Sequence, residues 1–211
     1  MIHRRVNYFS AHRLSSTRTV AGESGNGAGN FNFYNGSGVN YIYRTGKEFS
    51  DSLFSFGFNY RQYPGTTVEQ DTATLPIITW GAGALNGNAF AGGASDGDVG
   101  AMGFKYIKRN VYAYKSTFFF DGEMVSLGAG ITRKSGTANV YTTLNQCNLN
   151  GTVSYKSGNT ISQVNNSTKS VSNPSWIWHD SILYEPLTNQ NYIIQSEKRT
   201  NNQDVFTTII D

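Results

Sequence analysis

Apolar and polar residues alternate along most of this chain in short runs, the pattern of half-buried β-strands. The runs Val99–Ile107 and Val111–Phe120 flank Lys108-Arg109-Asn110 and predict a β-hairpin. No segment sustains a helical period. The other predicted strands are His3–Leu14, Val39–Arg44, Leu75–Trp80, Met124–Thr132, Asn139–Leu144, Leu149–Lys156, Trp176–Tyr184, Tyr192–Gln195 and Val205–Ile210.

Three further segments lack the strand pattern. Gly81–Gly100 and Ser157–Asn173 are polar and are predicted to be loops, and the aromatic segment Phe49–Phe58 is predicted to be irregular and to line a cleft. Strands at this regular spacing favour a sandwich or barrel. No internal repeat and no linker divides the chain, so we expect residues 1–211 to form one all-β domain.

Composition and charge agree with this fold class and limit the partners. The chain has 211 residues, 14% of them aromatic and 15% charged, which is ordinary for a folded all-β protein. Its net charge is +3, and no Lys/Arg cluster is dense enough for a nucleic-acid surface. No apolar run is long enough to span a membrane. Met1–Arg5 leads straight into a strand pattern without the features of a signal peptide.

The segment Ser15–Asn40, which we call the candidate loop, concentrates the polar chemistry of the chain. It includes Arg18, Glu23, Asn26, Asn30, Asn32 and Asn35, interleaved with Phe31, Phe33 and Tyr34. Amide and carboxylate groups suit a ligand rich in hydroxyls, because buried amides need partners, and aromatic faces suit the apolar face of a sugar ring. The alternative is a glycine-rich loop whose polar side chains are simply solvated.

Other groups of reactive residues are less informative. Cys147 is the only cysteine, so no intrachain disulfide is possible, and we expect a buried thiol. His179-Asp180 is predicted to fix a strand end through hydrogen bonds. Asp96-Gly97-Asp98 lacks the spacing of a calcium loop and is predicted to be a turn. The sequence predicts no metal site and no cofactor.

The candidate loop resembles the start of the central β-domain of polysaccharide lyase family 8, which includes hyaluronate, chondroitin and xanthan lyases. The resemblance extends in order along nearly the whole chain. The matching segments are S-x-x-R-T, E-S-x-N and Y-N-G-S-G within Ser15–Asn40, then Tyr63-Pro64-Gly65-Thr66-Thr67, Phe90-Ala91-Gly92-Gly93, Lys115–Ile131, Thr142–Gln146 and Trp178-His179-Asp180.

This resemblance implies a fold and a chemistry. The fold would be a large antiparallel β-sandwich of the galactose-mutarotase-like supersandwich type, and the reaction would be β-elimination on uronic-acid polysaccharides. By resemblance, Glu23 would orient and charge-balance a catalytic His or Arg across the cleft, and Asn26 would bond the substrate or a catalytic side chain. Arg18, Asn30, Asn32 and Tyr34 would contact the substrate.

The resemblance also implies missing parts. The family's proton-transfer residues belong to an N-terminal α/α-toroid, which would be this domain's partner in the parent protein, and a C-terminal β-domain would follow. We therefore expect this chain alone to be inactive and its parent to be extracellular or periplasmic. The alternative is a stand-alone β-sandwich that only binds carbohydrate or packs against a partner. An in-frame helical region upstream in the gene would favour the lyase.

Overall fold

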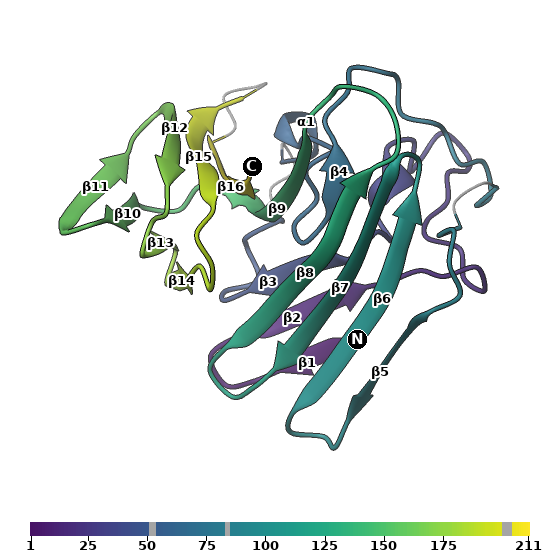
Figure 1. The fold of residues 1–211 in the computed structure, drawn as a ribbon, viewed down its shortest axis with the longest axis horizontal. Coiled ribbons are helices and arrows are strands. Elements are labelled where there is room, and N and C mark those ends of the chain that lie inside the picture. Colours follow the sequence, from purple (N-terminus) through teal and green to yellow (C-terminus); the bar gives the residue numbers. More distant parts are fainter. Residues whose placement is uncertain (51–53, 83–84, 200–203) are drawn as a thin grey trace.

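The structure, a computed structural model, describes residues 1–50, 54–82, 85–199 and 204–211, and the part it describes is built almost entirely of antiparallel strands (Figure 1). A 3₁₀ helix, η1 (Asn32–Tyr34), and one short helix, α1 (Phe54–Gly57), interrupt them. The strands are β1 (Ile2–Arg4), β2 (Phe9–Arg13), β3 (Val39–Tyr43), β4 (Thr67–Glu69), β5 (Ala91–Ser95), β6 (Gly100–Lys108), β7 (Val111–Phe119), β8 (Met124–Arg133), β9 (Val140–Asn148), β10 (Val153–Ser157), β11 (Thr160–Val164), β12 (Ser167–Ser172), β13 (Trp176–His179), β14 (Ile182–Tyr184), β15 (Asn191–Lys198) and β16 (Asp204–Ile210). Neither helix is long and apolar enough to cross a bilayer.

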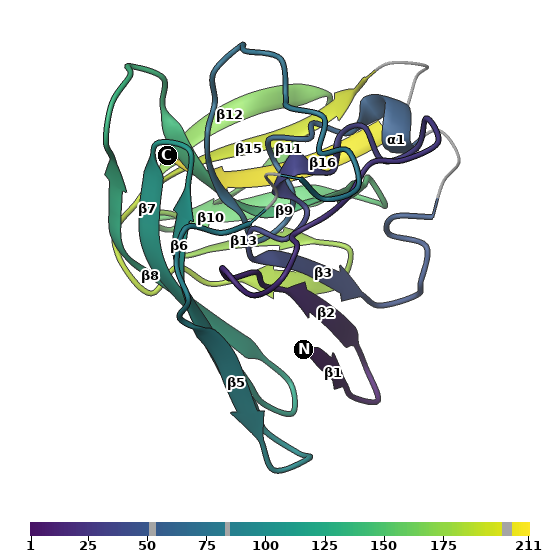
Figure 2. The same cartoon turned by 90° about the vertical axis from the view of Figure 1, so that its right-hand side faces the viewer.

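The strands form four sheets whose orders are β1-β2-β3, β5-β6-β7-β8, β12-β15-β16-β9-β4 and β11-β10-β13-β14. The β5–β8 sheet packs over β1–β3, and the five-stranded sheet joins this pair to the outlying sheet of β11, β10, β13 and β14 (Figures 1 and 2). The His3 and His12 rings, on β1 and β2, pack against Phe119 of β7. This layered antiparallel arrangement confirms the predicted sandwich.

Most of the predicted strands are present, and the predictions failed in a few segments. The hairpin of β6 and β7 and the strand β8 lie as predicted. His3–Leu14 and Trp176–Tyr184 each form two strands joined by a turn, and Leu75–Trp80 forms no strand. The predicted loop Gly81–Gly100 contains β5, and Ser157–Asn173 contains β11 and β12. Alternation reports one-sided burial, whereas these three strands are mostly exposed and polar or glycine-rich.

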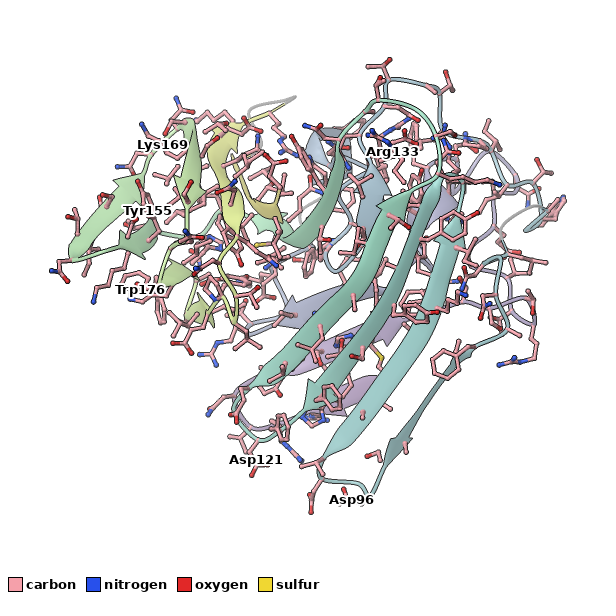
Figure 3. All side chains as sticks on the ribbon, viewed as in Figure 1. Asp96, Asp121, Arg133, Tyr155, Lys169 and Trp176 are labelled. Atoms are coloured by element: carbon pink, nitrogen blue, oxygen red, sulfur yellow. The ribbon has the colours of Figure 1, made fainter. Side chains whose placement is uncertain are left out.

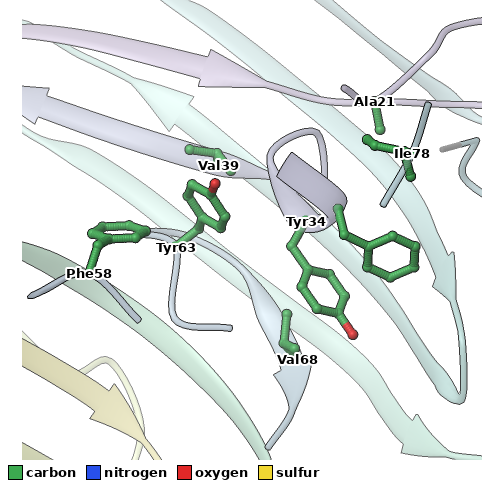
Figure 4. Packing of buried hydrophobic residues seen from close by; sticks show 8 residues of the cluster. Ala21, Tyr34, Val39, Phe58, Tyr63, Val68 and Ile78 are labelled. Atoms are coloured by element: carbon green, nitrogen blue, oxygen red, sulfur yellow. The ribbon is translucent and has the colours of Figure 1, made fainter. Parts of the chain in front are cut away.

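A hydrophobic core lies directly beneath the candidate loop. It consists of Ala21, Phe33, Tyr34, Val39, Phe58, Tyr63, Val68 and Ile78 (Figure 4). Four of these residues belong to the candidate loop itself. The loop is therefore anchored by its own apolar side chains, and Glu23, Asn26 and Asn30 remain exposed.

Two sequence-based predictions about local chemistry are confirmed. Asp96 accepts backbone hydrogen bonds from Asp98 and Val99 and so shapes the β5–β6 turn, which lies near Asp121 at the end of the sheet away from Arg133 (Figure 3). At the end of β13, His179 accepts a hydrogen bond from the Asn150 amide, and Asp180 accepts one from the Asn150 side chain.

Candidate functional site

The candidate loop connects β2 to β3, and its outermost part is a tight turn over residues 25–28. The Gly25 and Ala28 backbones exchange hydrogen bonds of 3.0 and 2.9 Å. Asn26 and Gly27 between them have φ angles of +50° and +77°. Positive φ at both central residues is the type I′ geometry, for which Asn-Gly is a favoured pair. The turn therefore accounts for the residue types at positions 26 and 27.

Side chains fix the backbone on both sides of this turn. The Asn32 amide donates to the Glu23 carbonyl at 3.0 Å, and the Ser24 hydroxyl donates to the Gly29 carbonyl at 2.7 Å. Gly29 has a φ of +75°, and a Cβ added to it would lie 2.6 Å from the Glu23 carbonyl oxygen. Asn32 and Gly29 therefore both pack closely against the backbone carbonyl of Glu23.

The Glu23 carboxylate itself is free. Glu23, Asn26 and Asn30 are exposed, and none of the three side chains has a hydrogen bond or ion pair with any residue the structure describes. Glu23 therefore does not brace the loop. It is a free carboxylate on an immobilised backbone, three residues from a free amide.

The other predicted site residues lie elsewhere. Arg18 is exposed but donates to the backbone carbonyls of Ala89 and Ala91, at 2.5 and 3.3 Å, and so ties the loop to that segment. The side-chain amide of Asn32 is used in the hydrogen bond to the Glu23 carbonyl, which we call the clasp. Tyr34 is only 1% exposed and packs in the core (Figure 4). In this structure these three residues support the loop, whereas Glu23, Asn26 and Asn30 face solvent.

Trp80 lies beside the candidate loop and was not among the residues that the sequence predicted for the site. Its backbone N–H donates to the Ser24 carbonyl at 2.8 Å, and its ring lies so close to Gly25 that an added Cβ there would meet the ring at 2.6 Å. The side chain is nonetheless 65% exposed, and the backbone has a φ of +49°, an outlier for a bulky residue. An exposed, strained tryptophan beside the turn is a functional signal. Trp80 stands at the end of the apolar run Leu75–Trp80, which the sequence predicted to be a strand.

A second exposed aromatic ring lies on the same loop. Phe31 is 54% exposed and stacks on Tyr60, with ring centroids 4.6 Å apart and an interplanar angle of 27°. Trp80 and Phe31 together give the loop two flat apolar faces next to its free carboxylate and amides.

The site lies on an open surface. A groove of about 840 Å³ runs between β8 and residues 181–188, but neither Glu23 nor Asn26 lines it. The exposed side chains of Glu23, Asn26 and Asn30 therefore lie outside this groove.

Cys147 and His179 are brought together by the fold, but away from this loop. The Cys147 sulfur lies 3.8 Å from Nδ1 of His179, and both residues are buried. Burial raises the pKa of the thiol and lowers the pKa of the imidazole to about 4. The pair therefore stays neutral, which agrees with the predicted structural thiol.

The fold is that of polysaccharide lyases. A solved chondroitinase AC lyase, described in complexes with oligosaccharides, superposes with a TM-score of 0.86 at 29% identity over 99% of this chain and 32% of that one. Paenibacillus xanthan lyase shares the fold alone, with a TM-score of 0.75 at 19% identity over 100% of this chain and 22% of that one.

Sequence comparison identifies the family. The profile of polysaccharide lyase family 8, super-sandwich domain, matches residues 1–208. Chondroitinase-AC of Pedobacter heparinus is 34% identical over 183 residues, 86% of this chain and 25% of that enzyme. Hyaluronate lyase of Thermasporomyces composti is 34% identical over 155 residues, 70% of this chain and 19% of that enzyme. The chain belongs to polysaccharide lyase family 8 as its super-sandwich domain, and spans a quarter or less of these relatives.

Proposed function

We propose that this chain forms one wall of the substrate cleft of a lyase that cleaves uronic-acid polysaccharides by β-elimination. The observation that carries the proposal is the exposed, unpartnered Glu23 carboxylate, held on a backbone that Asn32 and the turn at Gly25–Ala28 immobilise. The family membership and the relatives named for chondroitin and hyaluronate support a glycosaminoglycan-type substrate.

The reaction explains why such a carboxylate is useful. The proton removed lies next to a charged carboxylate and is weakly acidic, so the enzyme neutralises that carboxylate, supplies a base and protonates the leaving oxygen. We infer that the base and acid come from an N-terminal helical toroid of the same parent protein. A free glutamate facing a cationic His or Arg across the cleft orients it and holds it in its charged form.

The remaining exposed side chains suit the sugar. Asn26 and Asn30 each offer an amide that donates to and accepts from hydroxyl groups. Trp80 and Phe31 offer aromatic faces to the apolar faces of sugar rings. The same exposed aromatics also fit a stand-alone carbohydrate-binding module, which would bind sugar without needing Glu23. An extracellular or periplasmic location of the parent follows from a polymeric substrate.

The test is Glu23→Gln in the lyase that carries this domain. We expect kcat to fall on the order of a hundredfold or more with little change in KM, because the lost charge acts on the transition state. Asn26→Ala is expected to change KM and kcat together, because an amide bonds sugar in both states. Glu123→Gln, at the exposed β7–β8 turn, is the matched control. Near-normal turnover of Glu23→Gln would refute the catalytic role and leave the binding module.

A further inference from the structure

The tip of the β6–β7 hairpin carries two unfavourable features on consecutive residues. Lys108, the last residue of β6, is only 6% exposed. Arg109, the first residue of the turn that pairs Lys108 with Val111, has a φ of +52°. Glycine is the usual residue at such a position, and an arginine there is strained.

Lys108 points beneath the candidate loop. Its ammonium group donates to the Phe33 carbonyl and lies 4.1 Å from the centroid of the Phe33 ring and 5.7 Å from that of Tyr34. Among the described residues no carboxylate lies within ion-pair distance of it. Burial lowers the pKa of this amine to about 8. A buried ammonium without a carboxylate is unfavourable for stability. Stabilisation of the fold therefore does not explain why a lysine occupies this position.

Arg109 holds the next residue of the same 3₁₀ helix. Its guanidinium interacts with the Tyr34 hydroxyl and lies 2.8 Å from Asp71, which Arg61 approaches from the other side at 2.5 Å. Lys108 and Arg109 therefore contact consecutive residues of η1. Lys108 contacts the Phe33 carbonyl, and Arg109 contacts the Tyr34 hydroxyl.

A single residue, Asn32, connects these contacts to Glu23. Asn32, the first residue of η1, donates its side-chain amide to the Glu23 carbonyl and its backbone N–H to the Gly29 carbonyl. A shift of η1 therefore moves Asn32, and with it the backbone that carries the Glu23 carboxylate.

We propose that Lys108 and Arg109 are positioning residues that set the Glu23–Asn26 turn through η1. The hairpin tip keeps a buried cation and a strained backbone because both are directed at the loop rather than at the stability of the fold. The effect on turnover rests on the proposed function, whereas the effect on loop geometry does not.

The first experiment uses the 211-residue chain and needs no activity. Amide hydrogen exchange is measured at Ser24, Gly25, Ala28 and Asn32, whose N–H groups are bonded within or beside the loop. Lys108→Met, which keeps the packing and removes the ammonium, should speed their exchange roughly tenfold or more, since a charged hydrogen bond is lost. The melting temperature should hold or rise, because the buried charge is gone.

The matched control is Lys105→Met. Lys105 lies on the same strand, but its ammonium group lies over the Tyr114 ring, 5.4 Å from the centroid. This variant should leave loop exchange unchanged. Unchanged loop exchange in folded Lys108→Met, or a lowered melting temperature with the loop intact, would overturn the positioning role and leave Lys108 as a packing residue.

If Lys108→Met does not fold, Arg109→Gly tests whether the hairpin tip positions the candidate loop. Glycine accepts the φ of +52°, so this variant relieves the strain while removing the guanidinium that interacts with Tyr34 and Asp71. It should also speed loop exchange, and exchange equal to that of the unaltered chain would refute the proposal. In the complete lyase, Lys108→Met should lower kcat with KM nearly constant. Faster loop exchange with unchanged kcat would refute the proposed function of Glu23, not the positioning.

Discussion

Gly27 and Gly29 offer a controlled test of how tightly the candidate loop holds Glu23. Their φ angles are nearly equal, +77° and +75°, so an alanine at either position carries the same backbone strain. Their surroundings differ. A Cβ at Gly27 meets nothing within 4 Å, whereas one at Gly29 would lie 2.6 Å from the Glu23 carbonyl oxygen and 2.7 Å from Nδ2 of Asn32.

The expected magnitudes follow from this difference. A left-handed alanine costs about 1–2 kcal/mol of stability, which is the whole effect predicted for Gly27→Ala. Gly29→Ala adds the loss of the Asn32–Glu23 hydrogen bond, about 1 kcal/mol more. For a chain of this size, 1 kcal/mol lowers the melting temperature by about 2–4 °C. Gly29→Ala should therefore melt about 2–4 °C below Gly27→Ala.

A local probe separates loop displacement from general destabilisation. The Trp80 ring lies against Gly25, so its fluorescence reports the position of the turn, with Trp80→Phe giving the background from the other tryptophans. Gly29→Ala should change the Trp80 emission, and Gly27→Ala should not. Equal melting temperatures and equal Trp80 emission in the two alanine variants would show that the clasp on Glu23 is not a constraint.

Three further predictions concern the chain alone. The 211-residue polypeptide should release no unsaturated uronic-acid product from hyaluronan or chondroitin, because its three histidines are buried and none lies at the candidate loop; growth of product absorbance with the purified chain would contradict this. Cys147 should resist thiol reagents until the chain is denatured, because burial raises its pKa, and rapid native labelling would show otherwise. Burial lowers the pKa of His12 to about 3 and of His179 to about 4, from 6.5, so both stay neutral when folded. Their contribution to stability is complete above pH 6.5 and is lost as the pH falls through 4 toward 3; the melting temperature should fall over that range, less steeply in His12→Phe, and a flat profile would refute the assignment.

Several strands were predictable because one face is buried and the other is not, although β8 was also predicted and is mostly exposed. β6 alternates strictly, with Met102, Phe104 and Tyr106 inside, and its pattern is visible without any knowledge of the partners. β11 and β12 pair through their backbones while most of their side chains stay exposed, so hydrophobic periodicity carries no trace of them. In β11 and β12, pairing through the backbone without one-sided burial was therefore not predicted from the pattern.

The candidate loop was predictable as a location but not as an arrangement. Its density of amides, glycines and aromatics marked it. The roles of Arg18 and Trp80 depend on contacts with distant segments, the Ala89 carbonyl for one and Gly25 for the other. No local pattern encodes such contacts, so the anchoring role of Arg18 was not predicted and the exposed Trp80 was assigned to a strand.

The structure supports a functional role for Glu23 more strongly than for Asn26, although both were predicted as site residues. A type I′ turn favours asparagine at position 26 whether or not a ligand binds there, because asparagine tolerates a φ of +50°. No feature of the turn calls for a glutamate at position 23, where only the backbone carbonyl is used by the clasp. The side chain of Asn26 thus has a structural reason to be an asparagine, and the side chain of Glu23 has none in the described structure. The functional interpretation of the loop therefore depends on the Glu23 carboxylate, and a lyase unaffected by its removal would leave the loop as a turn with solvated side chains.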